Sequence, residues 1–344
     1  MTSDIILFLI QDGIANGAIY ALLGLAIVLV FAVTRIIMVP QGIFISYAAL
    51  SLSWLESNLV PPTAWLLLAL GLLTAGIECW QARRRPRAMR APLVKYVVLP
   101  AALLGLCWLL APQDLPQMAR MALALALVVP FGPIMYRLAF QPVAGASPLV
   151  LLLISVAVFI ALTSLGLVIF GPEGVRTAPI ATASFTLGVL DLSAQSLWVV
   201  GMTALLMVLL YLFFGRTIAG KALHATAVNR IGAKLVGIET NAAGGLAFTL
   251  AAAIGALSGI LISPITTIYY DTGFLMGLKG FIAAIIGGLL SYPLTVISAL
   301  VIGIIESFSS FSASLYKEVI VFSLILPVLL LRSLGRRDIG EDEQ

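Results

Sequence analysis

Charged residues are scarce in this chain, and cysteine and histidine are scarcer still. Only 10% of the 344 residues are charged, whereas 61% are hydrophobic. A soluble protein of this length needs far more charge to cover its surface, so the composition excludes one. The two cysteines are Cys79 and Cys107, and the single histidine is His224. One histidine argues against a His-rich metal site and against a His-based triad, so we predict no metal ligands and no catalytic residues.

Long apolar runs take the place of the missing charge. Runs of about 18 or more apolar residues predict transmembrane helices, and these runs lack the apolar–polar alternation of a membrane β-barrel. We therefore predict an all-α polytopic membrane protein with roughly eight to eleven transmembrane or re-entrant helices. It should form a single domain over residues 5–335, followed by a short tail at 336–344. The runs lie at Ile5–Val33, Val39–Leu55, Ala64–Trp80, Leu93–Leu110, Met118–Leu138, Pro148–Phe170, Ser196–Phe214, Ala242–Ser263, Thr272–Leu290, Leu294–Phe311 and Val319–Leu331, and we expect the Gly-rich run Thr272–Leu290 to be short, broken or re-entrant.

The Lys and Arg residues predict how the chain lies in the membrane. Basic residues accumulate on the cytoplasmic side, and the strongest basic run is RRRPRAMR at Arg83–Arg90. Placing this run inside puts the N-terminus outside and the C-terminus inside. Only Arg120, Arg176, Lys279 and Lys317 of the 19 basic residues then lie off the inner side. Because the basic residues gather at helix ends, the net charge of +4 does not indicate nucleic-acid binding.

The segment Gly215–Ile238 is a long polar interruption between two apolar runs. We name it the coupling segment; its basic residues are Arg216, Lys221, Arg230 and Lys234. Its apolar spacing predicts a short amphipathic cytoplasmic helix, broken near Gly232. Such a helix fits the groove of a soluble partner, and it equally fits the surface of an anionic lipid membrane. The residues themselves leave both interpretations open.

The start of the coupling segment resembles a phosphate-binding loop but lacks its last residue. Gly215, Gly220 and Lys221 have the required spacing, yet Ala222 stands where Ser or Thr must hold magnesium. Such a loop also follows a β-strand, whereas this one follows an apolar run. We therefore predict no nucleotide site and no cofactor in this chain, so that any energy source belongs to a partner.

Lys279 is the candidate residue for a transport path. A lysine at membrane depth is costly and is usually paired or functional. Asp271, Glu306 or the carbonyls of a broken helix are its candidate partners, while Gly277 and Gly280 leave the backbone close to neighbouring helices. The alternative is a lysine whose ammonium group reaches the outer membrane interface.

Two other places offer polar groups within the apolar runs. Gln41 and Gly42 follow Pro40, where a helix start can expose backbone groups to a ligand or simply form a turn. Asp12 and Asn16 in the first run form hydrogen bonds across helices or face the substrate. Together with Lys279, Gly280 and Glu306, we take Asn16, Gln41 and Gly42 as candidates for the substrate path.

Small residues recur at a spacing of four, which places them on one face of a helix. Small side chains allow close backbone contact in lipid, where no hydrophobic effect drives helices together. This pattern predicts tight helix packing, and its members are Gly13, Gly17, Ala243, Ala247, Ala251, Gly255, Gly259, Gly273 and Gly277.

These motifs together resemble the permease subunits of bacterial branched-chain amino-acid ABC importers. The resemblance is most specific in the coupling segment, at Ala222, Asn229, Ala233, Leu235, Gly237 and Ile238, with Lys221 where the family has Arg. It continues through Gly277, Lys279, Phe281, Ala283, Ala284, Gly287, Gly288, Gly303, Glu306 and Ser307. The first run, Asn16–Leu22, and the step Tyr136–Arg137 are similar as well. The second run departs from the family, because Met38–Gly42 shares only its glycine with the family pattern.

The resemblance implies a complex in the bacterial inner membrane. Two permease subunits, usually non-identical, pair within the lipid, two cytoplasmic ATPase subunits use ATP below them, and a periplasmic binding protein delivers the solute. The coupling segment would then transmit ATPase closure to the helices through Arg216, Lys221, Ala222, Asn229, Gly232, Ala233, Leu235, Gly237 and Ile238. The family also includes permeases for urea and short amides.

Two other classes of protein remain as alternatives. An ion-coupled secondary carrier needs no ATPase, but the long cationic segment and the absence of a convincing internal repeat count against it. An intramembrane enzyme is opposed by the lone histidine and by the lack of clustered acids or nucleophile motifs.

Overall fold

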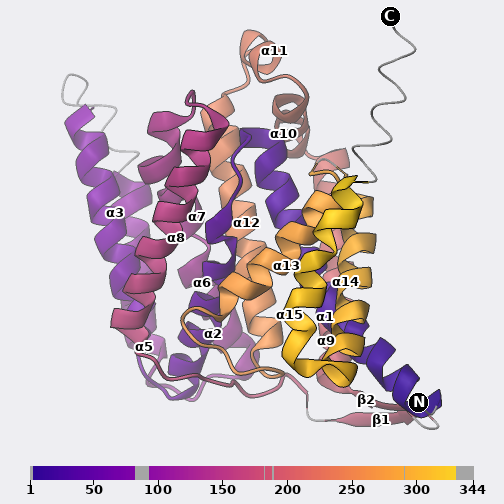
Figure 1. Ribbon diagram of the computed structural model, residues 1–344. Helices are drawn as coiled ribbons and strands as arrows, with labels where there is room; N and C mark the ends of the chain where they lie inside the picture. Colours follow the sequence, from indigo (N-terminus) through magenta and orange to yellow (C-terminus); the bar gives the residue numbers. More distant parts are fainter. Residues whose placement is uncertain (1–2, 82–92, 182, 188–189, 290, 331–344) are drawn as a thin grey trace, which may run out of the picture.

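The structure, a computed structural model, describes residues 3–81, 93–181, 183–187, 190–289 and 291–330. Helices account for nearly all of its regular structure (Figure 1), which confirms the all-α polytopic class. The basic run Arg83–Arg90, the arginines at 332, 336 and 337, and the predicted tail at 336–344 lie outside the described residues.

The first half of the chain forms apolar helices joined by short connections. In order they are α1 (Ser3–Thr34), the 3-10 turn η1 (Val39–Gly42), α2 (Ile43–Glu56), α3 (Pro62–Gln81), the π-helical turn η3 (Val94–Val98), α5 (Leu99–Leu110), α6 (Gln117–Val128), α7 (Phe131–Met135), the π-helical turn η4 (Tyr136–Phe140), the 3-10 turn η5 (Gln141–Val143) and α8 (Pro148–Phe170).

The second half begins with a short antiparallel hairpin in the longest loop. Its strands are β1 (Ser184–Leu187) and β2 (Leu190–Ser193), in which Ser184 pairs with Ser193. The helices that follow are α9 (Ala194–Arg216), α10 (Ile218–Val228), α11 (Arg230–Leu235), α12 (Thr240–Ile262), α13 (Thr272–Ile286), α14 (Tyr292–Ser312), the 3-10 turn η6 (Ser314–Tyr316) and α15 (Lys317–Ser323).

Among the described residues, seven helices are long and apolar enough to cross a membrane. They match predicted runs, and the other predicted runs form shorter helices, including Val94–Leu110 and Thr272–Ile286. The Gly-rich run is short, as expected, with 15 residues in α13, but this helix is unbroken. It ends where Gly288 and Leu289 adopt φ values of 87° and 61°.

Helix α1 forms the centre of the bundle, and α8 and α9 lie at its edge. In the most apolar window of α1, 94% of the residues are buried, compared with 17% in α8 and 11% in α9. An apolar helix that is buried all round lies in a protein interior, whereas an exposed apolar face suits contact with lipid. The two kinds of helix therefore differ in their surroundings and not in their hydrophobicity.

The small residues lie at close helix contacts, as their spacing predicted. A β-carbon added to Gly17 would lie 2.8 Å from the α-carbon of Leu300, and one added to Gly13 would lie 2.6 Å from that of Ile304. These glycines therefore allow α1 and α14 to touch backbone to backbone. On α12, an added β-carbon at Gly255 would lie 3.0 Å from that of Phe44, so this helix packs equally closely on α2.

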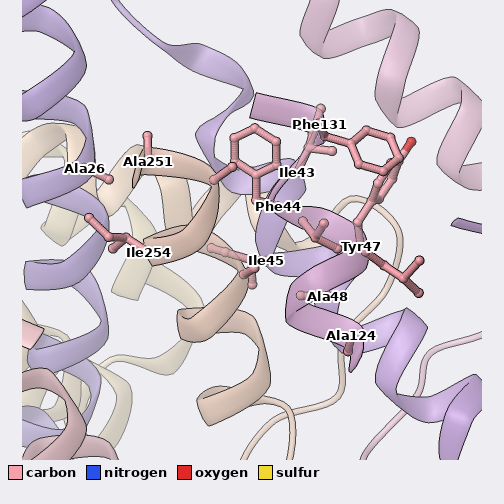
Figure 2. Packing of buried hydrophobic residues seen from close by; sticks show 14 of the residues in the cluster. Ala26, Ile43, Phe44, Ile45, Tyr47, Ala48, Ala124, Phe131, Ala251 and Ile254 are labelled. Atoms are coloured by element: carbon pink, nitrogen blue, oxygen red, sulfur yellow. The ribbon is translucent and has the colours of Figure 1, made fainter. Parts of the chain in front are cut away.

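The main hydrophobic core joins α2 to α7, α8 and α12. Figure 2 shows Phe44, Tyr47 and Phe131 packed among small residues such as Ala48 and Ala251. The rings of Tyr47 and Phe131 meet edge to face with 5.8 Å between their centroids. The hydroxyl of Tyr47 donates to the carbonyl oxygen of Leu162 at 2.7 Å, so this buried phenol is satisfied.

Candidate functional site

A cavity of about 730 Å³ lies between α1, α13, α14 and α15, with further lining residues from α8 and α12. Several of its residues come from the first half of α1 and from the connection before α13, so it extends toward the end of the bundle that carries the N-terminus (Figure 1). We name it the charged cavity, because it is lined by Asp12, Asp271, Lys279, Glu306, Lys317 and Glu318, together with Asn16 and Tyr20.

Lys279 is buried and bound by two carboxylates. Its Nζ atom donates to Oε1 of Glu306 at 2.6 Å and to Oε1 of Glu318 at 3.1 Å. The residue is only 5% exposed, so its ammonium group is held inside the protein. Its Nζ atom also lies 5.6 Å from the centre of the Tyr20 ring. Glu306 was one of the predicted partners, and these contacts join α13, α14 and the start of α15.

Asp12 holds a second polar contact at the same cavity. Its Oδ2 atom accepts hydrogen bonds from Nδ2 of Asn16 and from Oγ of Ser307, each at 3.2 Å. The Ser307 bond joins α1 to α14, as expected of this aspartate. The structure therefore brings together three of the predicted path residues, Asn16, Lys279 and Glu306, in one cavity.

The other predicted path residues lie at helix contacts and do not line the charged cavity. Gln41 is fully buried, and its Nε2 atom donates to the carbonyl oxygen of Ala251 at 2.9 Å. Gly42 touches the backbone of Gly273, where any side chain would collide. A β-carbon added to Gly280 would lie 2.6 Å from that of Leu23, so Gly280 brings α13 close to α1.

The coupling segment consists of two short helices. Arg216 ends α9, and Thr217 caps α10 by accepting a hydrogen bond from the amide of Gly220 at 2.9 Å. The resemblance to a phosphate loop thus falls on a junction between two helices. The break predicted near Gly232 lies three residues earlier, at Asn229, and Gly232 itself lies within α11.

Asn229 explains the position of this break. Its backbone is extended, with φ −148° and ψ 103°, and its Oδ1 atom accepts from the amides of Ile231 at 3.0 Å and Gly232 at 2.9 Å. An asparagine that caps a helix start in this way favours the new helix over continuation of the old one. Gly237, with φ 87°, follows the end of α11.

One side of the coupling segment packs on the bundle, and the other presents apolar side chains outward. Gly220, Leu223, Thr226 and Ala233 are buried. Ile218, Ile231 and Leu235 are 88%, 76% and 83% exposed. Of the predicted coupling residues, Ala233 is buried, Ala222, Gly232 and Ile238 are half-buried, and Arg216, Lys221, Asn229, Leu235 and Gly237 are exposed.

Comparison with known proteins places this architecture in a family. The family described as "Branched-chain amino acid transport system / permease component" matches residues 94–330, which is more than half of the chain. The chain belongs to this family. It is thus a permease subunit of an ABC importer and a multi-pass membrane protein, and such a subunit is not an enzyme by itself.

Permease proteins of two bacteria align with a large part of this chain. It is 28% identical over 221 residues to the high-affinity branched-chain amino acid transport system permease protein LivH of Escherichia coli, which covers 62% of this chain and 71% of LivH. It is 28% identical over 232 residues to the corresponding permease protein BraD of Pseudomonas aeruginosa, with 65% and 76% covered. No solved structure gives a significant match.

Sequence reasoning missed Glu318 as a partner of Lys279 in this permease. No role was predicted for Glu318, which stands beside Lys317 just before the apolar run Val319–Leu331. It begins α15, 39 residues away from Lys279, and only the turn at η6 brings it to the cavity. The sequence contained one signal for this contact. An acid begins a membrane helix, and the connection before that helix is too short to cross the bundle.

Proposed function

We propose that this chain is the membrane subunit of an ATP-driven importer for branched-chain amino acids. The observation that carries the proposal is the coupling segment, where Ile231 and Leu235 are 76% and 83% exposed at one end of the bundle. Exposed large apolar side chains on a short helix suit a groove of a partner protein. The partner is a cytoplasmic ATPase, of which the complex contains two copies, and this chain itself holds no nucleotide and no cofactor.

The proposal includes the orientation of the chain. Arg35 lines a pocket with His224 of α10, and Lys95 and Arg137 line one with Glu239 and Asn241, which follow α11. These residues therefore share one end of the bundle with the basic residues of the coupling segment. Figure 1 draws α1 starting at the opposite end from α10 and α11. The excess of basic residues at the α10–α11 end assigns that end to the cytoplasm of a bacterial cell with this chain in its inner membrane. The N-terminus then lies outside and the C-terminus inside, in a single domain over residues 5–335.

The charged cavity lies at the outer end in this orientation. A periplasmic binding protein docked there would release its solute beside Asn16, Lys279 and Glu306, and a second, non-identical permease subunit would complete the path. Lipid contacts the apolar outer faces of α8 and α9, of whose most apolar windows 17% and 11% are buried.

The test is reconstitution of the complex. The tagged chain is purified from its own membranes with its co-purifying subunits and placed in proteoliposomes with ATP on the coupling-segment side. Radiolabelled leucine should accumulate only when ATP and the binding protein are both present. Uptake of urea or acetamide in place of leucine would reassign the solute, and leucine accumulation by the purified chain alone in an ion gradient would overturn the proposal.

A further inference from the structure

The charged cavity carries more negative than positive groups. Its lining contains the four carboxylates of Asp12, Asp271, Glu306 and Glu318, and the ammonium groups of only Lys279 and Lys317. With every group ionised, its formal charge is −2. Asp271 is exposed and water can solvate its charge, but the buried and half-buried groups still carry three carboxylates against two ammonium groups. An ionised group away from water is stable only when paired, so this remaining excess points to a cation that the chain itself does not supply.

Lys279 cannot satisfy both glutamates. It shares one positive charge between Oε1 of Glu306 and Oε1 of Glu318. The Glu306 side chain is 10% exposed, yet its Oε2 atom has no hydrogen-bond partner among the described residues, and the same holds for Oε2 of Glu318. Buried acceptors without donors are costly, and these two lie in the lining of one cavity.

Asp12 on α1 adds a third carboxylate to the lining. The two groups that donate to its Oδ2 atom, from Asn16 and Ser307, are neutral. It therefore gains hydrogen bonds but no compensating charge from them. Within the described residues no group of three His, Cys, Asp or Glu side chains is arranged to hold a metal ion, so these acids suit a larger cation.

The lining also includes apolar side chains. Phe159, Ile262, Leu275 and Met276 belong to the same cavity as the charged and hydroxyl-bearing residues. A site lined by both charged and apolar side chains suits a small ligand that has one charged end and one apolar end. An aliphatic amine has this distribution, and so does a branched-chain amino acid with its ammonium group toward the acids.

Resting on the function proposed above, we propose that the charged cavity binds the ammonium group of the transported amino acid. Glu318, whose side chain is 34% exposed, and Asp12 receive the ammonium first, and Glu306 lies behind them with Lys279. The ammonium group supplies three donors and one positive charge, which is what the unpaired carboxylate oxygens lack. The terminal torsion of a glutamate is soft, so Oε2 of Glu318 turns toward the ligand at small cost. Lys279 is a positioning residue, which holds both glutamates at the cavity.

The experiment measures binding without the binding protein. The purified permease complex in detergent is titrated with 3-methylbutan-1-amine and, separately, with 4-methylpentanoate, and binding is followed by saturation-transfer NMR. These probes share a branched apolar end, and only the first has an ammonium group. The amine should bind and the acid should not. Equal binding of the amine and the acid overturns the proposal, and so does the absence of amine binding. If the amine does not bind, a proton on one of the carboxylates balances the charge of the cavity.

Variants locate the site. Glu318→Gln should weaken amine binding about tenfold, as expected from the loss of a hydrogen bond to a charged group, whereas Glu318→Asp should retain most of it. Asp12→Asn keeps the shape of its side chain and should also weaken binding, which covers the case in which Glu318→Gln fails to fold.

Glu173→Gln is the matched control, because Glu173 is exposed and lies outside the cavity lining. Unchanged amine binding in both Glu318→Gln and Asp12→Asn overturns the proposal.

The site and the importer function fail in different ways. If Glu318→Gln abolishes amine binding but the wild-type complex takes up no amino acid with ATP, the site stands and the proposed function is wrong. If ATP-driven leucine uptake is present and amine binding is the same in Glu318→Gln as in wild type, the function stands and the ammonium site is wrong.

Discussion

The charged cavity and the coupling segment have opposite distributions of polarity. In the cavity, charged side chains are inside the protein, with Lys279 5% and Glu306 8% exposed. In the coupling segment, large apolar side chains are outside, with Leu235 83% exposed. Charged side chains are usually exposed and large apolar side chains are usually buried, so each region reverses the usual arrangement. Each region therefore points to a bound group from outside this chain.

The two regions differ in how far the chain completes them by itself. The cavity satisfies part of its own requirement, because Lys279 shares its one positive charge between Glu306 and Glu318. The coupling segment buries Leu223 against the bundle but leaves Ile231 and Leu235 76% and 83% exposed. Mutations in the cavity should thus affect both folding and transport, and mutations on the coupling face should affect transport alone.

The largest effect is expected at Lys279. Lys279→Gln leaves Glu306 buried without its cation, which typically destabilises a protein by about 3–5 kcal/mol. We expect a large fall in the melting temperature of the purified complex and loss of leucine uptake. Lys279→Arg should also lose uptake, because the planar guanidinium needs more room than Gly277 and Gly280 leave beside it.

The double variant Lys279→Gln/Glu306→Gln separates the two roles of the pair. It removes both charges, so most of the thermal stability should return while uptake remains low. Scanning fluorimetry and uptake at matched expression measure the two quantities. Near-normal uptake by Lys279→Gln and Lys279→Arg would show that this lysine has no part in the transport path.

Leu235→Asp should produce the opposite pattern, which sharpens the comparison. The substitution places a charge on the exposed face of α11, so the fold and the melting temperature should not change. A charge at a desolvated apolar contact costs several kcal/mol, so ATP-driven uptake should fall at least about tenfold. Co-purification of the ATPase with the tagged chain measures the cause directly.

Leu315→Asp is the matched control for this variant. Leu315 is 94% exposed and lies in η6, between α14 and α15 at the other end of the bundle. It should not alter the amount of ATPase recovered. If Leu235→Asp retains wild-type amounts of ATPase, the coupling segment lies on lipid, which was the alternative left open by its sequence.

The sequence predicted the membrane helices well because hydropathy alone determines them. It also predicted a close helix contact at Gly13 and Gly17, which have the spacing that such packing requires, but it did not identify α14 as the partner. Hydropathy could not show that α1 is central and α9 peripheral, because both are equally apolar and only tertiary packing distinguishes them. For the same reason it could not place Gln41, whose partner is a backbone carbonyl 210 residues away.

The candidate sites were predicted unevenly. Glu306 was a correct partner for Lys279, since an acid in an apolar run needs a nearby cation. Glu318 was missed, because its position depends on the turn before α15. In the coupling segment the break was predicted near Gly232, and the side chain of Asn229 places it three residues earlier by capping α11.

The smallest effect is expected from the cap of α11. Asn229→Ala removes the acceptor for the amides of Ile231 and Gly232, and loss of such a cap typically costs about 1 kcal/mol. Because α11 is short and exposed, this cost should appear as local opening, with hydrogen exchange over residues 230–235 about fivefold faster and the melting temperature of the complex unchanged.

Asn229→Asp is the control, because it keeps an acceptor at the cap and should show hydrogen exchange like that of wild type. Uptake by Asn229→Ala should fall only about twofold, because Leu235 still occupies the same face in most molecules. Equal exchange in wild type and Asn229→Ala would mean that contacts with the ATPase, and not the cap, hold α11 in place. In that case, removal of the ATPase from the complex should make exchange over residues 230–235 faster in Asn229→Ala than in wild type.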